Sequence, residues 1–77
     1  MDLPGIGKRI RQAREAAGID SGAELARRLG VNQTTAWRWE ERDLAPDTEN
    51  LVKLNDLLRV SVDHLLFGSA RKRRRAA

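Results

Sequence analysis

The sequence predicts an all-α domain of five short helices, and three observations along the chain support this prediction. Apolar residues recur at helical spacing in five segments, residues typical of helix N-caps precede four of them, and glycines follow three. No segment alternates apolar and polar residues between turn dipeptides, as a half-buried strand would. A chain of 77 residues suffices for one small domain. We therefore predict a single helical domain over residues 1–68 and a separate tail over residues 69–77.

The first helix is predicted to begin near Pro4, because proline suits a first helical turn. It is predicted to end at Gly18, since glycine is typical of the position that follows a helix. Its apolar stripe, which should face the core, comprises Ile6, Ile10, Ala13 and Ala17.

The second and third helices are predicted from their N-caps. Ser21 followed three residues later by Glu24 matches a capping box, and Gly30 ends the second helix. Asn32 is a favourable N-cap for a third helix over residues 33–41. Two helices joined by a tight turn that starts with glycine are typical of a helix-turn-helix, although many other all-α domains contain such a corner.

The remaining two helices follow a loop. Residues 41–46 show no periodicity and end in a proline, which predicts the loop. Asp47 is the expected N-cap of the fourth helix and Ser61 that of a short fifth helix, which ends near Gly68. Their apolar residues are Leu51, Leu54, Leu57 and Leu58 in the fourth helix and Val62, Leu65 and Leu66 in the fifth.

The composition argues against several classes of function. There is no cysteine and a single histidine, so a disulfide framework and a protein-bound transition metal are not expected, and no cofactor is predicted. The sequence contains no Ser/His/Asp or Cys/His set and no glycine-rich phosphate loop after a strand, so an enzyme is not expected. No apolar run approaches the roughly 20 residues of a membrane span, and the N-terminus lacks a secretory leader. A cytoplasmic protein without a membrane partner is the expectation.

Charge is distributed unevenly along the chain. The net charge is +4, but five cations stand together at residues 71–75. Residues 1–40 contain seven Lys and Arg against five acids, whereas residues 41–70 contain three against six. The predicted helical body is thus close to neutral, and any surface on it that binds a polyanion must be local.

The stretch SGAELARRLGVNQTTAWRWE, residues 21–40, resembles the central motif of the Cro/CI-type (Xre-like) helix-turn-helix DNA-binding family. The likeness extends over residues 5–68, because IGKRIRQAREAAGI looks like the first helix of that family and VSVDHLLFG looks like part of its closing pair. The resemblance implies a compact five-helix bundle of the lambda-repressor-like type, with the second and third helices as the helix-turn-helix. It also implies a sequence-specific transcriptional regulator: a phage or prophage-type repressor, or an autoregulator, that binds a pseudo-palindromic operator in double-stranded DNA as a homodimer.

The resemblance also assigns roles to single residues. Gln33, Thr34 and Arg38 match the base-reading positions of the family. Their chemistry suits this role, because Gln pairs with adenine, Arg with guanine, and Thr contacts a thymine methyl group. Asn32 and the first N–H groups of the two helices should face phosphates. At one of these positions the family often has Gln where this chain has Gly22, so only the backbone N–H is left for that contact.

Further arginines are predicted to have different roles. Arg9 and Arg42 are weaker phosphate candidates, and for each the alternative is a solvated surface arginine. Arg14 and Glu40 match a pair found in the family, which implies a largely buried ion pair that fixes the recognition helix against the first helix. Asn55 stands where the family often has alanine, so its amide should need a hydrogen-bond partner.

The two tryptophans are two positions apart, so on one helix they point in nearly opposite directions. Trp39 continues the apolar side of the third helix together with Ala36, which predicts that it belongs to the core. Trp37 stands on the polar side, and we expect it to be exposed and to contact DNA in the major groove. The alternative is a half-exposed tryptophan that lies over a neighbouring side chain.

Three further expectations concern partners. A protein-interaction module that uses Trp37 to bind a partner such as a toxin or an antirepressor is the alternative to DNA binding. Leu65, Leu66 and Phe67 are adjacent apolar residues and the candidate dimer patch. The basic tail should be disordered without DNA and follow the phosphate backbone when bound, through Arg71, Lys72, Arg73, Arg74 and Arg75.

Overall fold

Five helices make up the described part of the protein, which spans residues 4–68 of the computed structural model. They are α1 (Ile6–Ala16), α2 (Gly22–Leu29), α3 (Gln33–Glu41), α4 (Thr48–Leu58) and α5 (Val62–Phe67). The all-α prediction is confirmed, and α3 has the bounds expected of the third helix. The predicted tail, residues 69–77, lies outside the described residues.

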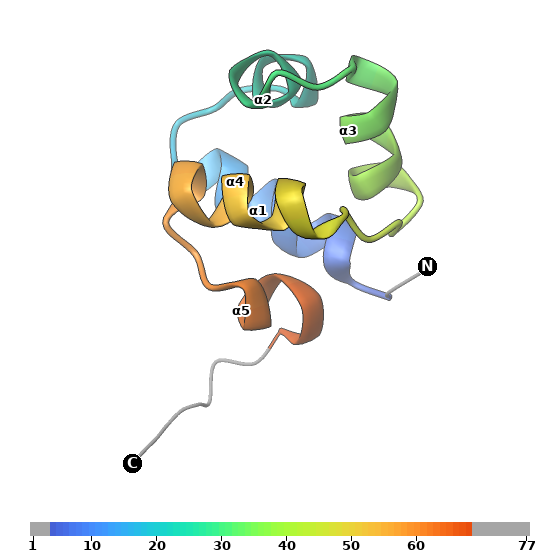
Figure 1. Ribbon diagram of the computed structural model, residues 1–77, viewed down its shortest axis with the longest axis vertical. Coiled ribbons are helices and arrows are strands. Elements are labelled where there is room, and N and C mark those ends of the chain that lie inside the picture. The colour runs from blue at the N-terminus through green and yellow to red at the C-terminus, as the bar shows by residue number, and fades with distance from the viewer. Residues whose placement is uncertain (1–3, 69–77) are drawn as a thin grey trace.

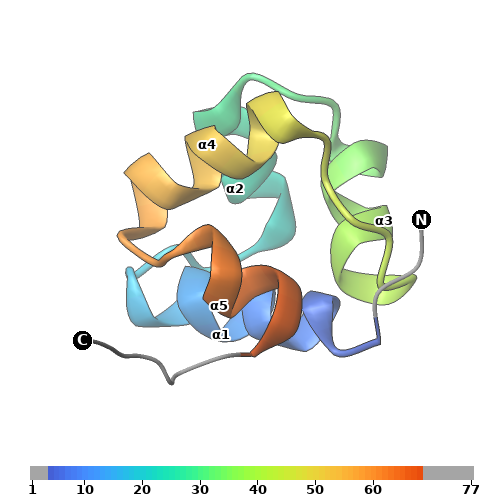
Figure 2. The same cartoon turned by 60° about the horizontal axis from the view of Figure 1, so that its bottom comes forward.

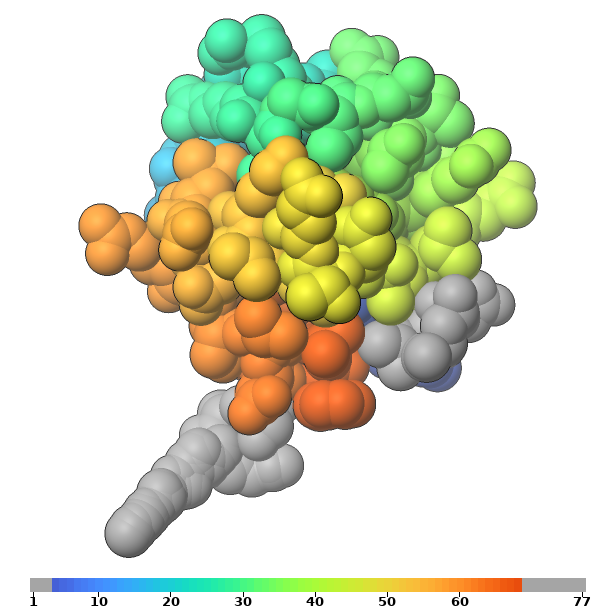
Figure 3. Space-filling model, in the orientation of Figure 1, coloured from blue at the N-terminus to red at the C-terminus, as the bar shows by residue number. Residues whose placement is uncertain are grey.

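The helices pack around one core. α1 contacts α3 and α5, while α2 contacts α3 and α4. Figure 1 shows α4 in front of α1, with α2 above both, α3 at one side and α5 below. In the turned view of Figure 2, α5 lies alongside α1 and α4 lies beside α2. α3 therefore rests on α1 and α2 and forms an outer edge of the molecule, which the space-filling view also shows (Figure 3).

Every helix contributes at least one fully or almost fully buried side chain to the core. The largest fully buried aliphatic residues are Ile6, Ile10, Ile19, Leu25, Leu54 and Leu65. Trp39 is 3% exposed and is the one tryptophan in this core. Burial of each large aliphatic side chain stabilises the fold by about 1.5–3 kcal/mol, so these few residues dominate the stability of so small a domain.

α1 begins at a later residue than the sequence predicted. The helix starts at Ile6 with Gly5 as its N-cap, so Pro4 precedes the helix instead of standing in its first turn. Gly5 has no side chain to cap the helix, and the missing acceptor comes from Asp43 in the loop before α4. The Gly7 N–H donates to Asp43 Oδ1 at 2.9 Å. A local proline signal was misleading here because the cap comes from a residue 36 positions away.

The C-terminus of α1 differs from the prediction in one residue. Ala17 was placed on the buried stripe, but it is exposed and lies outside the helix as its C-cap. Gly18 follows with a φ of 81°, as predicted for a stop, and its N–H donates to the Glu15 carbonyl at 3.0 Å. The chain then turns back, the Ile19 N–H donates to the Arg14 carbonyl, and Ile19 enters the core.

The capping residues predicted for the other four helices have their expected role. The side chains of Ser21, Asn32, Asp47 and Ser61 each accept a hydrogen bond from a backbone N–H in the first turn. The full capping box at Ser21 is not formed, however. Glu24 donates its N–H to Ser21 Oγ, but its carboxylate pairs with Arg27 and Arg28 on the same helix, because charged partners outcompete a backbone N–H.

Asn55, which stands where the family often has alanine, has a hydrogen-bond partner just after the end of α4. Its Nδ2 donates to the Val60 carbonyl at 2.7 Å, across the turn into α5. The amide is half-buried and has the partner that its position was expected to need. The apolar residues predicted for α4 divide into two that are buried, Leu54 and Leu58, and two that are partly buried, Leu51 and Leu57. No helix within residues 4–68 is long and apolar enough to cross a membrane.

Candidate nucleic-acid interface

The turn between α2 and α3 sets the direction in which α3 leaves the core. Gly30 adopts a φ of 74°, and the next N–H, that of Val31, donates to the Ala26 carbonyl at 3.0 Å. Asn32 then caps α3 by accepting from the Thr34 N–H at 2.7 Å. Glycine adopts a positive φ without the steric strain that other residues would have, so Gly30 allows the three-residue turn. The turn is the tight, glycine-first corner of a helix-turn-helix.

α3 has one buried side and one exposed side. Ala36 and Trp39 face the core, and Ala36 is fully buried. The side chains on the other side, which are all exposed, are Gln33, Thr34, Trp37 and Arg38. The structure thus brings together the four residues predicted to contact bases, on one surface of a helix at the edge of the molecule.

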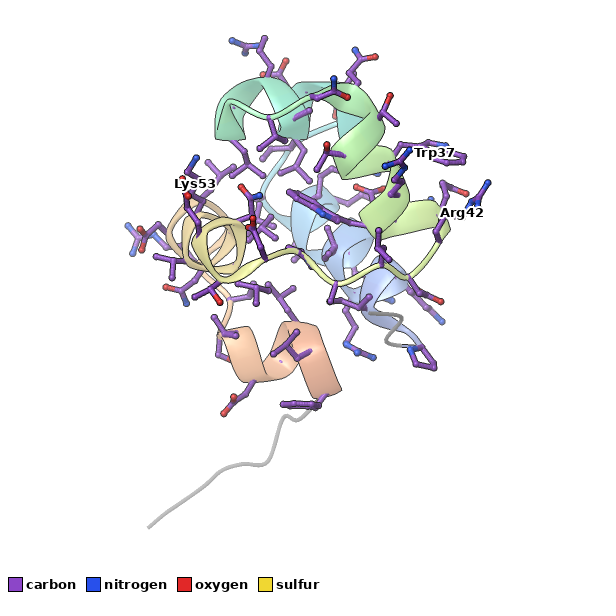
Figure 4. All side chains as sticks on the ribbon, turned by 45° about the vertical axis from the view of Figure 1, so that its right-hand side comes forward. Trp37, Arg42 and Lys53 are labelled. Atoms are coloured by element: carbon purple, nitrogen blue, oxygen red, sulfur yellow. The ribbon has the colours of Figure 1, made fainter. Side chains whose placement is uncertain are left out.

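The two tryptophans take the environments that helical periodicity predicts. Trp39 is 3% exposed, whereas Trp37 is 49% exposed. Trp37 is not an isolated surface aromatic, because the Arg42 guanidinium lies over its ring, 5.3 Å from the centroid. Figure 4 shows the side chains of Trp37 and Arg42 at the outer edge beside α3. Trp37 is thus half-exposed against a neighbouring side chain, which is the geometry of the alternative, and its contact with DNA stays a prediction.

A buried ion pair fixes α3 to α1. Arg14 Nε lies 2.9 Å from Glu40 Oε2 and Arg14 NH2 lies 3.2 Å from Glu40 Oε1, so the contact has two hydrogen bonds. The side chains are only 7% and 5% exposed. Arg14 NH1 also donates to the Ile19 carbonyl at 3.0 Å. Each nitrogen of the Arg14 guanidinium and each carboxylate oxygen of Glu40 thus makes a hydrogen bond, so the pair holds α3 without a stranded charge.

The arginines differ in whether a carboxylate already holds them. Arg11 of α1 reaches both Glu40 and Glu41, and the arginines of α2 are paired with Glu24. Arg38 on α3 and Arg42 just after it are exposed, and neither pairs with a carboxylate within residues 4–68. Within residues 4–68, α3 and its C-cap therefore present two cations that no carboxylate holds, Arg38 and Arg42.

A cleft of about 580 Å³ adjoins the exposed side of α3. It lies between α1, the start of α2 and α3, and Gln33, Thr34 and Trp37 form part of its wall. The cleft is open at Gly22 because this residue has no side chain. A Cβ placed there would meet only Glu40 Oε2, at 3.8 Å. The N-terminal ends of α2 and α3 thus open toward one concave surface, and their helix dipoles favour an anion at these two ends. Glu15, Glu40 and Glu41 also line the cleft, together with Arg11 and Arg14.

Arg9 contacts the end of α5. Its Nε donates to the Leu65 carbonyl at 2.9 Å and its NH2 to the Leu66 carbonyl at 2.8 Å. The guanidinium thereby caps the C-terminal end of α5, where the helix dipole favours a cation. Two of its donor groups are thus bound to α5, and the phosphate contact predicted for Arg9 stays a prediction. Its partners are 56 and 57 residues away in sequence, so no local pattern indicates them.

The other predicted sites divide into those the structure describes and those it does not. Asn32 and Gly22 stand at the two helix N-termini, as expected. Arg71, Lys72, Arg73, Arg74 and Arg75 lie outside the described residues. The apolar patch around α5 is smaller than predicted, since Leu65 is fully buried and Leu66 partly buried. Phe67 remains, and this residue is 65% exposed.

These features have the arrangement of a known family. Residues 10–65 match the family model described as "Helix-turn-helix". The chain therefore belongs to the Cro/CI-type (Xre-like) helix-turn-helix DNA-binding family.

Two relatives are similar to this chain over most of its length. The chain is 38% identical over 61 residues to the "HTH-type transcriptional regulator ImmR" of Bacillus subtilis (strain 168). It is 36% identical over 63 residues to "Repressor protein C2" of Salmonella phage P22. The aligned regions cover 79% and 82% of this chain but only 47% and 29% of the two relatives. The similarity thus concerns the helical domain and not the full length of these proteins.

Proposed function

We propose that this protein is a sequence-specific transcriptional regulator, of the repressor type, that inserts α3 into the major groove of double-stranded DNA. The observation that carries the proposal is the division of α3 into two sides. One side is fixed by Trp39 and by the Arg14–Glu40 pair. The opposite side presents two exposed polar side chains, an arginine without an acidic partner within residues 4–68, and an exposed indole.

The exposed side of α3 suits base recognition. Gln33 can bridge N6 and N7 of adenine, and Arg38 can bridge O6 and N7 of guanine. Thr34 and the edge of Trp37 can contact a thymine methyl group. A helix that enters the groove N-terminus first brings Gln33 and Thr34 to the bases ahead of Arg38. We assign these four residues to base contacts.

Contacts to phosphates surround this helix. Asn32 and the backbone N–H of Gly22 stand at helix N-termini beside the cleft, where a phosphate is electrostatically favoured. Arg42 adds a cation at the other end of α3. Gly22 has space for a larger side chain, and the backbone is what contacts phosphate there.

The tail is proposed to strengthen binding without adding sequence preference. Its five cations, residues 71–75, should follow the phosphate backbone. Deleting residues 71–75 should therefore weaken binding to every duplex alike and flatten the dependence of the logarithm of affinity on salt. Titrations of a specific and an unrelated duplex at several salt concentrations measure both effects. A loss confined to the specific site would contradict this role.

The repressor assignment and the dimer rest on different grounds. The names of the two relatives, a transcriptional regulator and a repressor, support regulation by DNA binding. One copy presents a single short recognition helix, so two copies on a pseudo-palindromic operator, with α3 helices about 34 Å apart, would provide useful affinity. Phe67 is the proposed centre of the dimer contact, because it is 65% exposed at the end of α5. Sedimentation of the DNA complex should give two proteins per operator, and a ratio of one would contradict the dimer.

The alternative is a protein-interaction module that binds a partner such as a toxin or an antirepressor through Trp37. An exposed tryptophan is a favoured anchor in protein interfaces, which is the observation that supports this alternative. The two functions respond differently to salt. DNA binding through phosphates weakens steeply as salt rises, whereas a contact centred on an indole does not.

The experiment is a selection of bound duplexes from a random DNA pool, followed by a salt titration on the selected duplex. We expect an enriched, pseudo-palindromic sequence and an affinity that falls steeply with salt. An absence of enrichment at low salt would contradict sequence-specific DNA binding and favour the protein partner.

A further inference from the structure

Trp37 and Arg42 form one structural unit on the outward side of α3. The guanidinium carbon of Arg42 lies 5.3 Å from the centroid of the indole, within the range of a cation–π interaction. The two are five positions apart, which corresponds to about 7–8 Å along a helix axis. The Arg42 side chain therefore folds back along α3 to reach the ring. Figure 4 shows the two labelled side chains adjacent to each other and far from Lys53 on α4.

The indole is the one group within residues 4–68 that is seen to hold the Arg42 guanidinium. Arg42 makes no ion pair with a carboxylate in this part of the chain. The neighbouring acid, Glu41, is paired with Arg11 of α1 instead. The Arg42 backbone closes α3 by donating its N–H to the Arg38 carbonyl at 3.0 Å. The backbone of Arg42 is thus fixed by the helix and its charged end by Trp37.

We infer that Trp37 is a positioning residue for Arg42, and that the pair contacts one DNA phosphate at the edge of the major groove as a single unit. The inference rests on the proposed DNA-binding function and adds to it a role for Trp37 other than base contact. A guanidinium is planar, so it can lie with its face on an indole and still donate hydrogen bonds from its edges to a phosphate. An arginine that is already held loses less conformational freedom when it binds.

This role makes a neutral side chain responsible for a salt-dependent part of the affinity. The slope of log affinity against log salt is negative, and loss of one phosphate contact on duplex DNA lowers its magnitude by about 0.9. Arg42→Ala should therefore lower the magnitude of the slope by about 0.9. Trp37→Ala should also lower it, by up to the same amount, although it removes no charge. A tryptophan that only touched a thymine methyl group or a sugar would leave the slope unchanged.

The experiment is a double-variant cycle on the duplex selected by the wild-type protein. Affinity is measured at several salt concentrations for the wild type, Trp37→Ala, Arg42→Ala and the double variant. The double variant should have the slope of Arg42→Ala alone. Its loss of affinity should be smaller than the product of the two single losses by about 2- to 5-fold, the equivalent of one exposed cation–π contact.

Matched variants separate positioning from other effects. Trp37→Phe retains an aromatic face and should recover part of the slope, whereas Arg42→Lys retains the charge but not the planar stack and should lose the coupling to Trp37. Gln33→Ala, a change on the same exposed side, should leave the slope unchanged. Arg38→Ala removes the unpaired cation within α3. The losses of affinity from Arg38→Ala and Trp37→Ala should be independent, so the double variant should show their product.

The outcomes distinguish this inference from the function on which it rests. A steep slope for the wild type that Trp37→Ala leaves unchanged would overturn the inference and leave DNA binding intact. A wild-type protein that binds no DNA would overturn both. In the free protein, Arg42→Ala should make tryptophan fluorescence more accessible to quenching by acrylamide, and equal quenching would show that the pair is not held in solution.

Discussion

The two sides of α3 follow the same helical geometry but differ in what holds their side chains. On the inward side, Trp39 and Glu40 are held by the core and by an arginine of α1. On the outward side, Trp37 lies against Arg42, which comes from just beyond the same helix. The inward side therefore determines where the helix lies, and the outward side is free to determine what it binds. Substitutions should separate the two, with losses of stability on one side and losses of DNA binding on the other.

The largest effect is expected from Glu40→Ala. The change leaves Arg14 with its charge in a place where its side chain is 7% exposed, so it should lower the free energy of unfolding by about 3–5 kcal/mol. Chemical denaturation of the wild type and the variant measures this. Glu41→Ala is the matched control, because it removes only a pair with the more exposed Arg11 and should cost about 0–1 kcal/mol. Equal midpoints for Glu40→Ala and the wild type would contradict the anchoring role.

The next effect concerns the contact between α1 and the end of α3. Gly7 is buried, and a Cβ there would overlap the carbonyl oxygen and carbon of Glu40. Backbone atoms cannot rotate away, so Gly7→Ala should force the two helices apart and destabilise the fold by about 1–3 kcal/mol. Gly22→Ala is the control, since its Cβ would meet one carboxylate oxygen at 3.8 Å. Thermal melts should rank the two variants in this order. A stable Gly7→Ala would show that α1 and α3 pack less closely than described here.

On the outward side, Trp37→Ala should leave the stability almost unchanged, because the ring is 49% exposed and outside the core. It should weaken binding to the selected duplex by about 1–3 kcal/mol, the range of one good base contact. Trp39→Ala is the opposite case and should lose about 3–5 kcal/mol of stability. Parallel melting curves and binding isotherms test the contrast. If Trp37→Ala unfolds the protein, the two sides of α3 have been assigned incorrectly.

The smallest effect is expected at Glu24, away from both sides of α3. Hydrogen bonds from Arg27, and then from Arg28, lower the pKa of Glu24 to about 2. A carboxylate with a lowered pKa contributes stability above its ordinary pKa of about 4.3. This contribution is lost as the pH falls toward the folded pKa of about 2. Glu24→Gln should therefore lose less stability than the wild type between these pH values, in denaturant titrations at each pH. Parallel pH profiles for the two proteins would show that the pairs do not stabilise the fold.

The fold was predictable from sequence wherever the determining interaction is local. Asn32 caps α3 through the Thr34 N–H two residues on, and Ser61 caps α5 through the His64 N–H three residues on. The start of α1 was not predictable in this way, because its cap is Asp43 from a distant loop. Ile19 was likewise missed, since its burial depends on how the chain turns after Gly18.

The same distinction applies to the candidate site. The opposite exposures of Trp37 and Trp39 follow from helical periodicity alone. The Arg14–Glu40 pair was implied only by the resemblance to a family, because nothing local joins α1 to α3. The position of Arg42 could not be derived from helical spacing, since residues five apart are not neighbours on a helix surface. The contact of Arg9 with α5 spans most of the chain and left no sign in the sequence.

The most direct measurement is a comparison of DNA selections from one random pool. The wild type, Gln33→Ala and Arg38→Ala are each used to select duplexes at the same salt concentration. If the outward side of α3 reads the bases, the wild type should enrich a pseudo-palindromic site. Each variant should then lose preference at a different single position in each half-site, while keeping the rest of the site. Identical enriched sequences for all three proteins, or no enrichment for the wild type, would contradict the assignment of this side of α3 to base recognition.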